Sequence, residues 1–340
     1  MTNCNADTLP DLGKVRGFQK VTSSEGFFIT CAIDHGDDYR ELIDPDLEKV
    51  TYERTVESKM RLVDALSPYV SSFLLDPEYA AAHSIFSGKL QRDTGLMVCV
   101  EEEGGYLGTG PKGETRFRKN WNAAKIKKMG ADMCKLLWFF RPDGPIQEVQ
   151  RDIAHGVVED CADASLPLVV EPIWNPLEGE DPSLDAWQDR RADGVVESAV
   201  IASELGADML KLEFPGRVDT EEQQRAAAAR CRRISESVDI PWVILSAGVD
   251  YDAFRTQVQL ACEAGGSGFM AGRSIWRDAV PKGNSESSSE GVERATSRMA
   301  ELAEITAKYG TPYKPSMDIA SVTGALDKYW YHDWHQLPSQ

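Results

Sequence analysis

Two lysines stand inside apolar runs, and they are the residues most open to chemistry. Lys135 interrupts Met-Cys-Lys-Leu-Leu-Trp-Phe, and Lys211 interrupts Met-Leu-Lys-Leu. A buried ammonium is costly unless it is paired or reaches water, and burial beside a second cation lowers the pKa of a lysine. The resulting neutral amine can attack a ketone. Alternatively, each lysine is a strand-end residue whose ammonium reaches solvent, and spacing alone does not decide between the two.

Carboxylates stand at the ends of other apolar runs. Glu171 ends the run between the two lysine runs, where it can carry protons to and from a substrate hydroxyl. It can also form an ion pair with Lys135 or Lys211, and the two roles are compatible. Asp34 either orients a hydroxyl or neutralises a lysine, although a turn aspartate is the commoner case. Glu101–Glu103 is either a cation site or, as we expect, a solvated acidic loop.

Eight short apolar runs alternate with amphipathic stretches, and these elements must position the residues above. We expect strands over 27–33, 72–75, 96–100, 132–140, 168–173, 208–214, 242–248 and 268–273. We expect helices over 52–66, 122–129, 146–164, 221–237, 251–264 and 294–309. This is the count of an α/β fold, the (β/α)₈ or TIM barrel. A doubly wound open sheet is the alternative, and we favour the barrel because polar residues recur at strand carboxyl ends all round.

Small residues and an arginine end the last two predicted strands, as Ser246-Ala247-Gly248 and Ala271-Gly272-Arg273. That corner of a barrel often binds phosphate through backbone N–H groups. Gly248 and Gly272 permit a close backbone approach, and Arg273 can add bidentate charge. A structural ion pair is the alternative for Arg273, and we favour phosphate.

The chain of 340 residues is expected to form a single barrel domain, since such a barrel needs about 250 residues plus insertions. An N-terminal extension of about 1–24 and a C-terminal tail of about 311–340 flank it. The polar segment 282–291 is expected to be a mobile excursion. The aromatic stretch 329–335 is expected to pack on the body.

The composition excludes several classes of partner. The formal net charge is -18, which argues against nucleic acid because that ligand needs a basic surface. There is no apolar run of about 18 residues, so no membrane span is expected. The first residues contain no apolar signal core, so a cytoplasmic location is expected.

Neither cysteine nor histidine spacing indicates a metal or a disulfide framework. The seven cysteines include no CxxC pair, and we expect buried, reduced thiols. The five histidines show no metal spacing, and His332 with His335 is expected to belong to a surface tail. We therefore expect no metal and no cofactor.

Several longer segments match a known family in order: 75–81, 121–140, 166–173, 206–215 and 244–276. They include LLDPEYA, GADMLKLEFP and the highly specific spacing of LSAGV and AGRSIW. On these motifs the sequence resembles the class I tagatose 1,6-bisphosphate aldolases, a group that includes sulfofructose-phosphate aldolases. The match covers about residues 25 to 280.

The resemblance implies a (β/α)₈ barrel in which Lys211 forms the Schiff base and Glu171 shuttles protons. Lys135 would contact substrate and help lower the pKa of Lys211, while Asp34 would bind near the reacting hydroxyls. The phosphate would be held by Ser246, Gly248, Gly272 and Arg273. The substrate would be a phosphorylated ketose, cleaved to dihydroxyacetone phosphate and a three-carbon aldehyde. A homo-oligomer is expected.

Two positions depart from the family pattern. Relatives usually carry Asp-Gln at the end of the first strand, whereas this chain has Asp34-His35, which alters a substrate-facing position. Glu101–Glu103 replaces a segment that carries a lysine in relatives. Both changes weaken the case for a second phosphate and leave the Schiff-base chemistry intact. The alternatives are a sulfofructose-phosphate or deoxyketose-phosphate aldolase and, from another class, a non-catalytic barrel that senses a metabolite.

Overall fold

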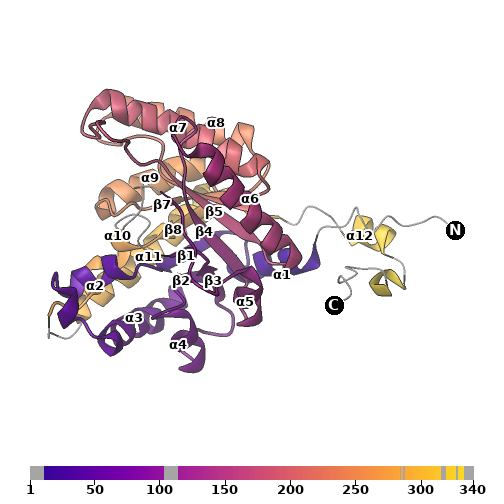
Figure 1. Ribbon diagram of the computed structural model, residues 1–340, viewed down its shortest axis with the longest axis horizontal. Helices are drawn as coiled ribbons and strands as arrows, with labels where there is room; N and C mark the ends of the chain where they lie inside the picture. Colours follow the sequence, from indigo (N-terminus) through magenta and orange to yellow (C-terminus); the bar gives the residue numbers. More distant parts are fainter. Residues whose placement is uncertain are drawn as a thin grey trace.

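A closed ring of eight parallel strands forms the centre of the molecule (Figure 1). The computed structural model describes residues 11–102, 114–283, 285, 288–314, 319–326 and 328–332. The strands are β1 (Phe28–Ile33), β2 (Ser72–Leu75), β3 (Gly95–Cys99), β4 (Met133–Phe139), β5 (Leu168–Ile173), β6 (Met209–Leu212), β7 (Trp242–Leu245) and β8 (Gly268–Ala271). Each strand pairs with its neighbours in sequence, and β8 pairs with β1. The expected TIM barrel is confirmed, and the open sheet is excluded.

Helices surround the barrel (Figure 1). They are α1 (Leu12–Val21), α2 (Asp37–Ile43), α3 (Tyr52–Leu66), α4 (Ala81–Phe86), α5 (Ala123–Lys128), α6 (Gln147–Asp163), α7 (Asp185–Glu204), α8 (Glu221–Ser237), α9 (Tyr251–Glu263), α10 (Arg273–Trp276), α11 (Ser289–Tyr309) and α12 (Ile319–Ala325). No helix among the described residues is long and apolar enough to span a membrane.

The observed elements follow the sequence pattern closely, with informative exceptions. Strand β7 ends at Leu245, earlier than expected, because Ala247 and Gly248 have φ angles of 46° and 72° that no strand residue adopts. Helix α11 begins at Ser289, so the end of the segment expected to be mobile is helical. The sequence predicts no bounds for α7, because charged residues dilute the apolar spacing of its first turns.

Apolar side chains fill the inside of the barrel. The inner cluster consists of Phe18, Val21, Phe28, Ala32, Leu74, Met97, Met133, Val169, Met209, Val243 and Met270. Phe18 and Val21 belong to α1, so the N-terminal extension contributes to this core. The Tyr313 ring stacks on Phe18 at 4.6 Å between centroids, which ties the start of the C-terminal tail to the same cluster.

The aromatic end of the chain does not pack as expected where the structure describes it. Tyr329 and Tyr331 are 52% and 57% exposed, so the expected packing on the body is wrong for these two side chains. Figure 1 shows α12 outside the ring of helices that surrounds the barrel. His335 lies outside the described residues.

A buried ion pair holds the carboxyl ends of β1 and β2 together. Lys59 of α3 is fully buried and pairs with Asp76, which is 1% exposed and follows β2. The same ammonium donates to the carbonyl oxygens of Ile33 at 3.2 Å and His35 at 2.6 Å. One lysine thereby fixes the turn that carries Asp34 and His35.

We predict that Lys59→Met lowers the free energy of unfolding by about 3–5 kcal/mol, because it leaves the buried Asp76 carboxylate without its counterion. Urea denaturation measures the change. Lys49→Met is the control, since Lys49 pairs with Asp46 on the surface with its side chain 66% exposed. Equal unfolding midpoints for the two variants would contradict the structural role of Lys59.

Candidate active site

Five charged side chains meet at the carboxyl ends of the strands. The Lys135 ammonium nitrogen lies 2.6 Å from Glu101 Oε1, 2.9 Å from Glu171 Oε2 and 3.1 Å from Asp34 Oδ2. The Lys211 nitrogen lies 3.0 Å from the same Glu171 oxygen. The two contacts of Glu171 have ion-pair distances without the alignment of hydrogen bonds. Both lysines and three carboxylates therefore form one cluster.

The alternation of the strands explains why these residues converge. Lys135 lies two residues after Met133 on β4, and Lys211 lies two residues after Met209 on β6. Glu171 stands in the same relation to Val169 on β5. All three preceding residues belong to the inner core, and a two-residue step in a strand keeps the same face. Three adjacent strands thus present a functional group one layer above the core.

Neither lysine reaches solvent as the alternative interpretation requires, because the side chains of Lys135 and Lys211 are 3% and 5% exposed. Burial opposes the charge of Lys135, but Glu101, Glu171 and Asp34 outweigh it and raise its pKa well above the ordinary value. The expectation of a lowered pKa is therefore wrong for Lys135, which stays an ammonium.

Asp34 is held as a carboxylate. Burial opposes its charge, but Lys135, Lys211 and His35 together lower its pKa far below the usual range. The pair formed with Lys135 Nζ therefore joins two permanent charges at neutral pH. A charged carboxylate at this point can accept hydrogen bonds from hydroxyl groups but cannot donate one.

Glu101 is buried, so the expectation of a solvated loop is wrong for this residue. It is 5% exposed, and its backbone pairs with Phe117 in an isolated antiparallel bridge. Glu102 is exposed, and Glu103 lies outside the described residues. The sequence signal for Glu101 is its spacing from β3: it lies two residues after Cys99 and four after Met97. Alternate strand residues share a face, so Glu101 lies on the inner face of the barrel with Met97.

His35 lies beside the cluster as a neutral ring. Burial first, and then the charges of Arg273, Lys211 and Lys59, lower its pKa to about 3 against the opposing effect of Asp34. The ring packs edge-on against Trp276 at 5.4 Å between centroids. A Cβ at position 272 would lie 2.9 Å from His35 Cε1, so glycine is needed there.

The predicted phosphate corner brings together the ends of β7 and β8. Ser246 Oγ accepts a hydrogen bond from the Gly272 N–H at 3.4 Å. Gly248 is so close to two guanidinium groups that an added Cβ would lie 3.0 Å from Arg277 Nη2 and 3.4 Å from Arg273 Nε. The corner therefore combines two guanidinium cations with a glycine backbone that lies close to them.

Arg273 also forms the ion pair that was its alternative role, because its Nη1 lies 2.9 Å from Asp38 Oδ2. Its Nε remains beside Gly248. Sequence reasoning missed Arg277, although its position four residues after Arg273 in the turn that follows β8 places the two side chains on one side.

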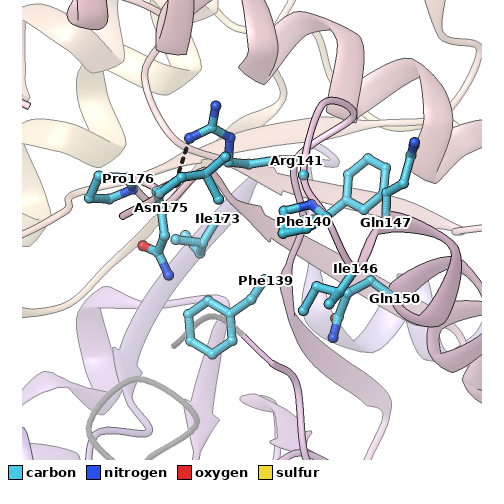
Figure 2. Close-up of a pocket in the computed structure, with 12 residues that line it drawn as sticks. Phe139, Phe140, Arg141, Ile146, Gln147, Gln150, Ile173, Asn175 and Pro176 are labelled. Carbon is cyan, nitrogen blue, oxygen red and sulfur yellow. Dashed lines mark hydrogen bonds between the residues drawn. The ribbon is translucent and has the colours of Figure 1, made fainter. Parts of the chain in front are cut away.

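A cavity of about 90 Å³ lies beyond the ends of β4 and β5 (Figure 2). Phe139 and Ile173 line it, and they follow Lys135 and Glu171 on the same strands. None of the five clustered residues lines this cavity, so it does not contain the cluster. Figure 2 shows Arg141 above it, donating to the Asn175 carbonyl oxygen at 3.1 Å.

The described residues contain no group of three or more histidine, cysteine or acidic side chains that could hold a metal ion. The six described cysteines are buried and free, as expected. The candidate site is therefore built from amines, carboxylates and guanidinium groups, which suit proton transfer and attack on a carbonyl.

Comparison with known proteins gives a consistent picture. The family model described as DeoC/LacD family aldolase matches residues 29–278. The tagatose 1,6-diphosphate aldolase of Listeria monocytogenes serotype 4a is 27% identical over 284 residues, covering 79% of this chain and 82% of that protein. Tagatose 1,6-diphosphate aldolase 1 of Streptococcus mutans is 26% identical over 281 residues, covering 77% and 84%.

Solved structures share the fold. An archaeal fructose 1,6-bisphosphate aldolase superposes with a TM-score of 0.59 at 17% identity, covering 87% of this chain and 99% of its own. The fructose-bisphosphate aldolase from Slackia heliotrinireducens gives a TM-score of 0.61 at 15% identity, covering 100% and 96%. At these identities the likeness supports the barrel alone.

The low pKa of His35 predicts a specific dependence of stability on pH. An unfolded histidine titrates near 6.5, so between about pH 6.5 and 3 the unfolded chain binds a proton that the folded chain does not. The stabilisation from neutral His35 is complete above that range and falls as the pH decreases. Between about pH 7 and 5, the free energy of unfolding should therefore decrease in both proteins, and the decrease should be about 1–2 kcal/mol smaller for His35→Gln than for the wild type.

Urea unfolding at the two pH values measures this difference. His155→Gln is the matched control for the same substitution at an exposed position, because the His155 side chain is 58% exposed. If His35→Gln and the wild type lose the same stability on acidification, His35 is charged in the folded protein and the account of this position is wrong.

Proposed function

We infer the reaction from one premise: this chain belongs to the DeoC/LacD family of aldolases. The protein is an aldolase, a carbon–carbon lyase. We propose that it works as a class I enzyme, in which Lys211 forms a Schiff base with a phosphorylated ketose. The observation that carries this proposal is the buried Lys211 amine, 3.0 Å from a carboxylate oxygen that a second, charged lysine also contacts.

The two lysines have different surroundings, and this difference supports different proposed roles. Lys135 contacts three carboxylates and is held as an ammonium. Lys211 contacts a single carboxylate among the described residues. Lys211 is therefore the nucleophile, and Lys135 is the fixed cation that binds substrate oxygen and orients Glu171.

The proposed reaction is a retro-aldol cleavage. The Lys211 amine adds to the C2 ketone as the free base, and Glu171 donates the proton with which the carbinolamine hydroxyl leaves as water, giving a protonated imine and a Glu171 carboxylate. Glu171 accepts the proton of the C4 hydroxyl while the C3–C4 bond breaks and its electron pair moves into the imine. The aldehyde leaves, C3 of the enamine takes up a proton, and water releases dihydroxyacetone phosphate.

The remaining predicted residues have binding roles in this scheme. We propose that the C1 phosphate lies at the corner formed by Ser246, Gly248, Gly272, Arg273 and the additional Arg277. Asp34 accepts hydrogen bonds from hydroxyls near the reacting carbons, and His35 closes the same side as a neutral ring. The two guanidinium groups beside Gly248 support the phosphate assignment.

We propose tagatose 1,6-bisphosphate as the first substrate to test, since the similar proteins from Listeria and Streptococcus carry that activity in their names. A sulfofructose-phosphate or deoxyketose-phosphate would use the same lysine and the same phosphate corner. A metabolite-sensing barrel without catalysis would not need the buried lysine pair. We also propose a cytoplasmic homo-oligomer, because barrel enzymes commonly associate.

Lys211→Met is expected to abolish cleavage and to leave the fold intact, because the thioether fills the same space without an amine. Borohydride reduction in the presence of dihydroxyacetone phosphate should add mass to the peptide that contains Lys211 in the wild type and to no peptide in the variant. Mass spectrometry of the digested protein measures both.

Lys14→Met is the control for a lysine at the other end of the barrel, where Lys14 pairs with Asp208. It should keep full trapping. Mass added to a Lys135 peptide instead would reverse the roles of the two lysines, and loss of wild-type activity with a chelator would replace the Schiff-base mechanism by a metal-dependent one.

A further inference from the structure

One carboxylate oxygen of Glu101 has no hydrogen-bond donor among the described residues. Its Oε1 lies 2.6 Å from Lys135 Nζ, while its Oε2 is buried and receives no hydrogen bond from the described residues. The side chain is 6% exposed. A buried carboxylate oxygen without a donor is unfavourable, and native proteins usually supply such a group with a partner. Inside a catalytic cavity that partner can be the substrate.

The order of strands places this oxygen across the barrel mouth from the phosphate corner. Glu101 follows β3, and β3 lies four places from β7 in the ring of eight. Gly248 and the two guanidinium groups follow β7 and β8, whereas Lys211 is on β6 and Glu171 on β5. A ketose phosphate held at β7–β8 and joined to Lys211 through C2 therefore extends its later carbons towards β3 and β4.

The chemistry of that side suits hydroxyl groups. Three carboxylates, from Asp34, Glu101 and Glu171, contact the Lys135 ammonium, and hydroxyl groups can donate hydrogen bonds to their remaining oxygens. An ionised carboxylate only accepts hydrogen bonds, which favours a hydroxyl donor and repels an anion.

We propose that Glu101 is a substrate-binding residue whose free Oε2 accepts a hydrogen bond from a hydroxyl of the aldehyde half of the substrate. The inference rests on the proposed Schiff-base function and adds a substrate class to it: ketose phosphates that carry a hydroxyl beyond the C3–C4 bond. Glu101 then has two functions, since one oxygen holds Lys135 and the other selects the aldehyde.

The reverse reaction separates these two functions. Dihydroxyacetone phosphate is offered with glyceraldehyde, which carries hydroxyls, or with propanal, which has the same carbon number and none. The measured quantity is the ratio of kcat/KM for the two aldehydes. We expect Glu101→Met to lower this ratio at least about 10-fold, as loss of a charged hydrogen-bond partner does, and Glu101→Gln to lower it less because a neutral amide remains.

Glu213→Gln is the matched control. Glu213 is also a carboxylate at the mouth, but Arg191 at 3.1 Å and the Trp174 N–H at 2.9 Å occupy its two oxygens. Its substitution should leave the aldehyde ratio unchanged. A residue that only positions Lys135 would affect both aldehydes equally, so an unchanged ratio in both Glu101 variants overturns the inference.

Borohydride trapping with dihydroxyacetone phosphate alone is measured on every variant first. Trapping at Lys211 in both Glu101 variants shows that the nucleophile is intact and that the aldehyde ratio reports on Glu101. Failure of the wild type to trap contradicts the proposed function and this inference together. Trapping with an unchanged ratio contradicts this inference alone.

Discussion

The Lys135 ammonium, buried among three carboxylates, is the interaction around which the active end of the barrel is arranged. A charge removed from water needs counterions at hydrogen-bonding distance, and here they come from the ends of β1, β3 and β5. These segments converge on Lys135 of β4. Lys211 contacts one of these carboxylates, Glu171, and in the proposed mechanism this asymmetry makes Lys135 the fixed cation and Lys211 the nucleophile.

The closed barrel makes this arrangement possible. Lys135, Glu171 and Lys211 each follow an inner core residue by two positions along a strand. The packing of Met133, Val169 and Met209 therefore determines how far along the barrel axis the three functional groups lie. The ring order also sets which groups lie together: two guanidinium groups lie beside Gly248 after β7, and the carboxylates that contact Lys135 come from the ends of β1, β3 and β5.

Much of this is visible in the sequence, because strand alternation and glycine-rich turns depend on local pattern. The strand positions, the barrel and the lysine pair follow from that pattern. Glu101 does not stand out, because three consecutive glutamates resemble a solvated loop until the inner face of β3 is followed from Met97. The raised pKa of Lys135 depends on carboxylates that are distant in sequence, and no local pattern contains their distances. The placement of Arg277 beside Gly248 depends on the short helical turn after β8, which the sequence pattern does not predict.

The central claim is that Lys135 is a permanent cation, and ¹⁵N NMR of lysine side chains in the folded protein tests it most directly. The Lys135 signal is assigned by its loss in Lys135→Arg. An ordinary lysine is half deprotonated at about pH 10.4, and at that pH the Lys135 nitrogen should still have the chemical shift of an ammonium. A Lys135 signal that titrates at or below that pH would show that the carboxylates do not hold its charge, and the division of roles between the two lysines would be wrong.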